Sequence, residues 1–134
     1  MSESEGGGSG KPKAIVVGHG QFSAGLVSAV GQICGLADKL VVLSNVGQTP
    51  QDIEATLREH LARTGARVIF TDLPGGSATI AARRIAKENP DIVLVSGVNL
   101  ATLLDFVFSS GPPEEAARAA AERGKASLIV IERG

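Results

Sequence analysis

A histidine and an aspartate follow two separate apolar runs of the sequence, and together they could carry phosphoryl-transfer chemistry. His19 stands between Gly18 and Gly20, and Gly18 directly follows the apolar residues 14–17. Asp72 follows the apolar residues 68–70, one position after Thr71. A neutral imidazole is a nucleophile, and a carboxylate beside it fixes its tautomer and makes the free ring nitrogen more nucleophilic. We therefore interpret His19 as the acceptor of a phosphoryl group and Asp72 as its orienting partner.

An anion site is predicted beside this pair. Gly75, Gly76 and Ser77 begin a predicted helix, where free backbone N–H groups and a hydroxyl suit a phosphate. Gly20 is a further candidate, because a glycine opens the backbone around the histidine. Each feature also has a purely structural explanation. A histidine at a strand end is common, an aspartate there forms turns or caps, and paired glycines separate strands from helices.

The candidate residues need elements that bring them together, and the apolar pattern predicts such elements. Five apolar runs are typical of strands, at residues 14–17, 40–43, 67–70, 92–95 and 127–132. Amphipathic segments between them predict five helices. The first helix is expected to be capped by Ser23 and to end at Gly35, and the second to start at Thr49-Pro50 and to end at Gly65. The third is expected to start after Ser77 and to end at Asn89-Pro90. The fourth is expected to be capped by Asn99 with a last apolar residue at Phe108, and the fifth to cover residues 114–123 and to end at Gly124.

The alternation of strands and helices predicts an α/β fold with an open, mostly parallel sheet and helices on both faces. In the third helix we expect Ile80, Ala81 and Ile85 to face the sheet. Turns that follow adjacent parallel strands face one crevice, so the fold predicts that Asp72 lies near His19. A chain of 134 residues is expected to form one domain. Residues 1–12 are predicted to be a flexible polar tail and residues 13–134 the folded domain.

Composition and motifs argue against several other classes of protein. A net charge of −1 and the absence of Trp and Tyr argue against a nucleic-acid partner. No apolar run approaches the roughly 20 residues that a membrane span needs. The single cysteine, Cys34, is typical of a reducing compartment, and we expect the cytoplasm.

Sites for common cofactors are also poorly supported. Gly18-His19-Gly20 begins like a dinucleotide-binding loop, but position 23 is serine, and the second strand ends in Ser44-Asn45 without an acidic residue for a ribose. No Gly-Lys-Ser/Thr sequence of a nucleotide-binding loop occurs. The other histidine, His60, is surrounded by charged residues and is expected to face solvent. We therefore predict no metal and no cofactor.

Three segments, taken together and in this order, resemble the IIA component of the mannose family of the bacterial sugar phosphotransferase system (PTS), and most closely its N-acetylgalactosamine-type members. They are residues 15–22 with the following Gly25, residues 71–77 and residues 96–100. The resemblance implies that His19 accepts a phosphoryl group from the carrier protein HPr. The group then passes to a IIB component, which phosphorylates a sugar that enters through a membrane permease. The resemblance also implies that Asp72 pairs with the histidine and that Ser77 lies at the phosphate.

The resemblance further implies a flavodoxin-like fold with four parallel strands and a homodimer. The last strand, residues 127–132, would be an antiparallel edge strand exchanged between subunits. Ala78-Thr79 stand where the family usually has Pro-Phe, a departure that concerns the surface offered to partners. Three alternatives stay open: a regulatory phosphoprotein of the same family without a transport role, the phosphoryl-donor subunit of a dihydroxyacetone kinase, and a flavodoxin-like binding module without phosphate chemistry. The sequence does not identify the sugar.

Overall fold

A single parallel sheet forms the centre of the molecule. The computed structural model describes residues 11–133, so residues 1–10 of the predicted tail lie outside the described residues. The strands are β2 (Ala14–Gly18), β3 (Leu40–Ser44), β4 (Val68–Thr71) and β5 (Val93–Ser96), in the order β3-β2-β4-β5. Each neighbouring pair is parallel. The predicted α/β fold with four parallel strands is therefore confirmed.

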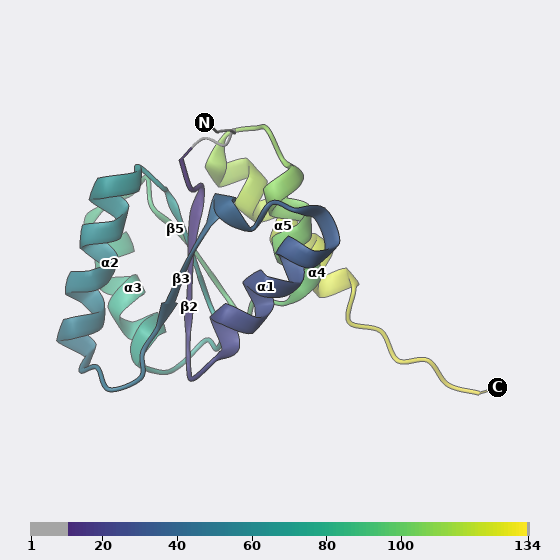
Figure 1. Cartoon of the computed structure of the whole chain (residues 1–134), viewed down its shortest axis with the longest axis horizontal. Coiled ribbons are helices and arrows are strands. Elements are labelled where there is room, and N and C mark those ends of the chain that lie inside the picture. Colours follow the sequence, from purple (N-terminus) through teal and green to yellow (C-terminus); the bar gives the residue numbers. More distant parts are fainter. Residues whose placement is uncertain (1–10, 134) are drawn as a thin grey trace.

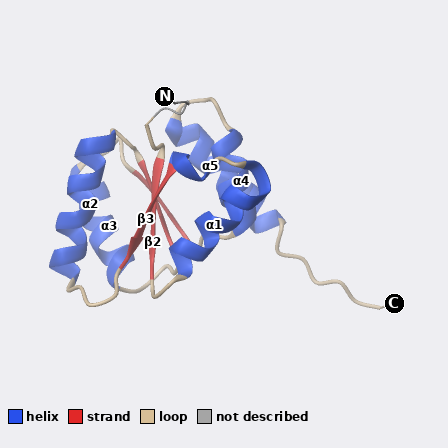
Figure 2. Cartoon of the chain, viewed as in Figure 1, coloured by secondary structure: helices blue, strands red, loops and turns tan. Residues whose placement is uncertain are grey.

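Helices cover both faces of the sheet (Figures 1 and 2). One face carries α2 (Pro50–Thr64) and α3 (Ser77–Glu88). The other face carries α1 (Phe22–Cys34), α4 (Leu100–Phe108) and α5 (Pro113–Ala126), and the short 3₁₀ helix η1 (Ala37–Lys39) leads into β3.

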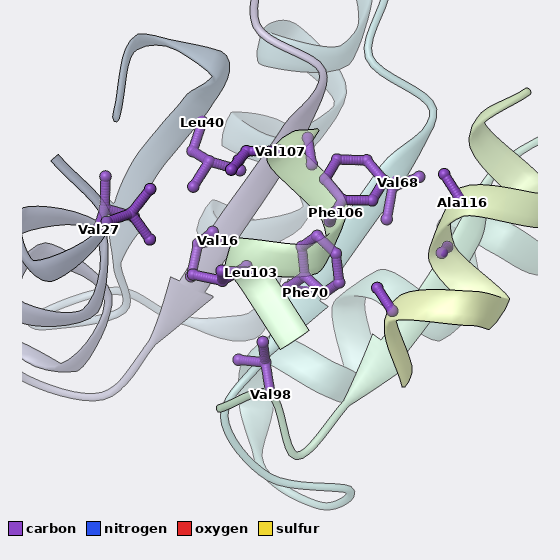
Figure 3. Packing of buried hydrophobic residues seen from close by; sticks show 14 residues of the cluster. Val16, Val27, Leu40, Val68, Phe70, Val98, Leu103, Phe106, Val107 and Ala116 are labelled. Carbon is purple, nitrogen blue, oxygen red and sulfur yellow. The ribbon is translucent and has the colours of Figure 1, made fainter. Parts of the chain in front are cut away.

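The helices on both faces of the sheet explain why residues 14–17 are all apolar. Ile15 and Val17 belong to the core cluster under α2 and α3, whereas Val16 belongs to the cluster under α1, α4 and α5. A strand that is covered on both faces needs apolar residues at every position. Figure 3 shows the second cluster, in which the rings of Phe70 and Phe106 meet edge to face with centroids 5.1 Å apart.

Two of the predicted helix caps are confirmed, and one is wrong. Thr49 and Asp52 form a reciprocal capping box, and Asn99 accepts a hydrogen bond of 2.9 Å from the backbone N–H of Thr102. Ser23 does not cap α1, which begins at Phe22. Ser23 is instead buried against β3, and its hydroxyl donates a hydrogen bond of 2.6 Å to the carbonyl of Leu43. A buried hydroxyl needs a partner, and here the neighbouring strand supplies it.

Two other helix predictions are corrected by packing. Gly124 does not end α5 but lies inside it, where α5 meets α4 so closely that a Cβ would lie 1.9 Å from Thr102 Oγ1. The glycine is required there for helix packing and not for a helix end. Ile80 is 52% exposed instead of buried. The inward face of α3 is formed by its small residues and Ile85.

The predicted last strand is not formed within the single chain. Residues 127–133 have no strand pairing and lead away from the body of the molecule in Figure 1. Their apolar side chains are exposed, and those of Leu128 and Ile131 are each 85% exposed. A strand needs a neighbour for its backbone N–H and C=O groups, and no neighbour is placed beside this segment among the described residues.

Candidate functional site

His19 and Asp72 meet at the carboxyl edge of the sheet. β2 ends one residue before His19, β4 ends one residue before Asp72, and the two strands are direct neighbours. Nδ1 of His19 lies 2.8 Å from Oδ2 of Asp72, and the backbone N–H of His19 donates a hydrogen bond of 2.9 Å to the same oxygen. The His19 side chain is 54% exposed, whereas the Asp72 side chain is only 9% exposed. The arrangement presents an accessible imidazole on a buried carboxylate.

The protonation of Asp72 decides which ring nitrogen of His19 is free. Burial of the Asp72 carboxyl raises its pKa, but hydrogen bonds from the backbone N–H and ring of His19 lower it by more, so the pKa of Asp72 lies below its ordinary value. An ionised carboxylate only accepts hydrogen bonds, so Nδ1 of His19 must carry the proton. The lone pair of the neutral ring is then on Nε2, the nitrogen that does not face Asp72.

The start of α3 lies against the ring of His19. A Cβ on Gly76 would lie 3.3 Å from Cε1 of His19, and Gly76 has a φ of +95°, which favours glycine. Ser77 is the first residue of α3, so its backbone N–H belongs to the positive end of the helix dipole. A Cβ on Gly75 would meet nothing within 4 Å. Gly20, with a φ of +51°, shapes the turn that follows His19. The structure therefore joins His19, Asp72 and Gly76 directly, with Ser77 one residue further along the chain.

Gly18 is required for the approach of Asp72, and its replacement gives a testable expectation. A Cβ at position 18 would lie 2.9 Å from both Cγ and Oδ2 of Asp72. Gly18→Ala is therefore expected to displace Asp72 from His19 and to destabilise the fold by about 1–3 kcal/mol, as overpacking does. Gly25→Ala is the matched control, because a Cβ there meets nothing within 4 Å. Chemical denaturation checks both variants. Equal stability of the two would contradict the close approach.

A buried cluster of hydroxyl groups supports the turn that carries Asp72. Thr79 Oγ1 donates to the carbonyl of Leu73 and lies 2.8 Å from Thr71 Oγ1, and Thr71 and Ser96 share a hydrogen bond of 2.6 Å. Ala78 and Thr79, each 1% exposed, stand where the resemblance implies Pro-Phe. The departure therefore lies beneath the site and not on the surface offered to partners.

The sequence interpretation missed Ser44 and Asn45, which the structure brings to the site. Ser44 Oγ donates to the carbonyl of Gly20 at 3.0 Å, and the Asn45 side-chain amide donates to Ser77 Oγ at 3.3 Å. The sequence marks these two positions only as the place where a ribose-binding acid is lacking. The signal that could have found them is their position at the end of a parallel strand, because β3 is the other neighbour of β2.

Residues 11–133 contain no group of three or more His, Cys, Asp or Glu side chains placed to hold a metal ion. In the same residues, no helix combines the length and apolar character that crossing a membrane requires. The other histidine, His60, lies on α2, and its Nδ1 is 3.0 Å from Nη2 of Arg63.

The fold and this site define an α/β protein of the flavodoxin-like kind with a histidine–carboxylate pair at adjacent strand ends. The family model for mannose-type EIIA, described as the PTS system fructose IIA component, matches residues 13–123. The chain therefore belongs to this family of PTS IIA components. The predicted membership in the mannose family is confirmed.

Solved structures are similar to this chain over most of its length. Phosphotransferase system component EIIA from Streptococcus agalactiae has a TM-score of 0.80 at 22% identity, covering 88% of this chain and 95% of that one. The mannose/sorbose specific IIA subunit from Enterococcus faecalis has a TM-score of 0.79 at 24% identity, covering 92% and 97%. Both likenesses show the fold. No curated protein matches the sequence significantly.

Proposed function

We propose that this chain is a phosphohistidine carrier of a phosphoenolpyruvate-dependent sugar phosphotransferase system. His19 accepts a phosphoryl group from HPr and passes it to a IIB component, for uptake of a sugar of the mannose or N-acetylgalactosamine class. Membership in the PTS IIA family supports this role. The observation that carries it is the contact of 2.8 Å between Nδ1 of the exposed His19 and Oδ2 of Asp72. Cys34 is a free cysteine, which is usual in a reducing compartment, and we infer that the carrier acts in the cytoplasm.

The proposed transfer exchanges one P–N bond for another. The lone pair of His19 Nε2 attacks the phosphorus of phosphohistidine on HPr. The P–N bond of the donor breaks, and its electron pair returns to the donor ring. His19 keeps its proton on Nδ1, so the phosphorylated ring is cationic and the Asp72 carboxylate stabilises it. Transfer to a nucleophilic side chain of the IIB component repeats the exchange with His19 as the donor. Positioning and electrostatics supply most of the catalysis in such transfers.

The start of α3 is proposed to hold the phosphoryl oxygens. The backbone N–H groups at Gly76 and Ser77 lie at a helix N-terminus, where an anion is stabilised, and the Ser77 hydroxyl adds a donor. Gly20 directly follows His19 and Gly75 directly precedes Gly76, and neither position is crowded, because a Cβ on either would meet nothing within 4 Å. In this proposal Gly20, Gly75, Gly76 and Ser77 are the phosphate-binding residues.

Exposed apolar side chains near His19 support a protein as donor and acceptor. Phe22 lies three residues after His19, Leu73 directly follows Asp72, and Val46 directly follows Asn45. All three side chains are exposed. Apolar side chains around a reactive group are typical of an interaction surface.

We also propose that the protein is a homodimer that exchanges its C-terminal segment. Residues 128–131 are four consecutive exposed apolar residues, which a monomer would leave in water. β5 pairs only with β4 among the described residues, so its outer edge is open. Val95 of β5 and Leu128 line the same hollow, so the segment begins beside that edge. Antiparallel pairing of the segment with β5 of the other subunit would cover both features.

Intact-mass spectrometry after incubation with phosphoenolpyruvate, the first PTS enzyme and HPr tests the function. The expected result is the gain of one acid-labile phosphoryl group, absent from His19→Ala. His60→Ala is the matched control and is expected to gain the group like the natural chain, because His60 lies on α2. A phosphorylated protein that passes its group to no IIB component would favour the regulatory alternative. The absence of any gain would contradict the proposed function.

A further inference from the structure

The turn that follows β3 contacts the backbone on both sides of His19 and also the start of α3. The backbone N–H of Asn45 donates to the carbonyl of Gly18 at 3.1 Å. Ser44 Oγ donates to the carbonyl of Gly20 at 3.0 Å. The side-chain amide of Asn45 donates to Ser77 Oγ at 3.3 Å. This turn therefore ties the nucleophile's own loop to the residue that begins α3.

The direction of the bond between Asn45 and Ser77 matters for an anion. A serine hydroxyl has one proton to donate and two lone pairs that accept. The Asn45 amide nitrogen donates to Ser77 Oγ, so it occupies a lone pair and leaves the hydroxyl proton unused. Phosphoryl oxygens only accept hydrogen bonds, so a hydroxyl that accepts from an amide is prepared to donate to them.

Asn45 is itself held in place by its backbone. The hydrogen bond from Asn45 N–H to Gly18 fixes the residue beside the last position of β2, and Ser44 is fixed to Gly20 in turn. The Ser44 hydroxyl also accepts a hydrogen bond of 3.2 Å from the backbone N–H of Val46, which closes the turn. Asn45 and Ser77 are both half-buried, so the bond between them is partly shielded from competing water.

We propose that Asn45 is a positioning residue for phosphoryl transfer: by donating to Ser77 Oγ, it directs the Ser77 hydroxyl proton to the phosphoryl group on His19. The inference rests on the proposed function of His19. Asn45 acts through Ser77, so its contribution must disappear when the Ser77 hydroxyl is absent. This requirement separates a positioning role from a general contribution to the stability of the turn.

A double-mutant cycle on the full chain tests the inference. The rate of phosphorylation of His19 by phosphorylated HPr is measured for the natural chain, Asn45→Ala, Ser77→Ala and the double variant. Asn45→Ala is expected to slow the transfer about tenfold, the size of one hydrogen bond. In the Ser77→Ala background the same change is expected to have no further effect. Asn89→Ala is the matched control, because its amide binds the carbonyl of Ile85 at the far end of α3.

Asn45→Asp distinguishes the direction of the bond from its presence. A carboxylate has a similar shape but only accepts, so Ser77 would donate its proton to position 45 and lose it for the phosphoryl group. We expect slower transfer than in Asn45→Ala, with an unfolding midpoint close to that of the natural chain. Natural rates in both variants, or equal slowing of Asn45→Ala with and without Ser77, would overturn the inference. A natural chain that accepts no phosphoryl group would instead contradict the proposed function.

Discussion

Replacing Asp72 by asparagine is expected to slow phosphorylation of His19 by about 10²- to 10³-fold, the loss typical when one preorganised electrostatic partner is removed. Oδ2 of Asp72 accepts from both the backbone N–H and the ring of His19. An asparagine that keeps its oxygen in this position loses the negative charge that offsets the cationic phosphorylated ring. Its amide nitrogen would take the position of Oδ1, which is buried without a hydrogen-bond partner among the described residues.

The opposite orientation of that asparagine is no better for transfer. Its amide would face the backbone N–H of His19, and two donors would then oppose each other. Nδ1 would have to accept, so the ring proton would move to Nε2 and remove the attacking lone pair. Both orientations therefore predict a slower reaction and a protein destabilised by an unpaired buried group, by about 1–3 kcal/mol.

Time-resolved mass spectrometry with phosphorylated HPr measures this effect. Asp38→Asn is the matched control, because Asp38 is an exposed residue of η1, before β3 begins. Its rate is expected to equal that of the natural chain. NMR of the ring nitrogens supplies a second readout: the proton is expected on Nδ1 in the natural chain and to be redistributed in Asp72→Asn. A variant with the natural rate would show that the carboxylate has no part in the transfer.

Replacing Ile129 by aspartate is expected to convert the proposed dimer into monomers. Ile129 lies in the exposed apolar segment at residues 128–131. Burying an isoleucine side chain stabilises by about 1.5–3 kcal/mol, and a two-fold symmetric dimer buries two copies. The loss of about 3–6 kcal/mol corresponds to a dissociation constant raised by about 10²- to 10⁴-fold. Sedimentation equilibrium over a range of protein concentrations measures this constant.

Ile33→Asp is the matched control for the dimer experiment. Ile33 is also an exposed isoleucine, but it lies on α1 instead of the C-terminal segment. The Ile33→Asp variant carries the same change from isoleucine to aspartate, and the dissociation constant of its dimer is expected to stay near that of the natural chain. A chain without residues 128–134 is expected to be monomeric as well. A natural chain that is monomeric throughout the concentration range, or an Ile129→Asp variant that remains dimeric, would contradict the exchange.

Local sequence patterns determined most of the elements of this protein. The apolar run at residues 14–17 predicted a doubly covered strand, and Thr49-Pro50 and Asn99 predicted two helix starts. These patterns act within a few residues, through strand burial and through side chains that bind their own helix N-terminus. His19 and Asp72 are predicted as site residues for the same reason, since a single residue separates each of them from an apolar run.

Apart from the expected approach of Asp72 to His19, the tertiary structure decided where side chains bond across elements. Ser23 is predicted as a helix cap, but its hydroxyl binds the carbonyl of Leu43. Gly124 is predicted as a helix end, but it lies inside α5, where the absence of a side chain lets Thr102 of α4 pack against the helix. Both outcomes depend on a neighbour that is distant in the sequence, and the local pattern of apolar residues does not indicate which residue that neighbour is. The contact of Asn45 with Ser77 depends likewise on β3 and β4 flanking β2.

The sequence by itself therefore determined which residues lie at strand ends, and it carries the prediction that His19 takes a phosphoryl group. The tertiary structure decided that β4 lies beside β2, which brings Asp72 Oδ2 to 2.8 Å from His19 Nδ1. It also left residues 127–133 unpaired in the single chain, although their apolar pattern is that of a strand. The physical reason is the same in both cases. The pattern of apolar residues in the sequence indicates which residues are buried, but it does not indicate which strand pairs with which. Pairing depends on the neighbouring strand that supplies hydrogen-bond partners for the backbone N–H and C=O groups.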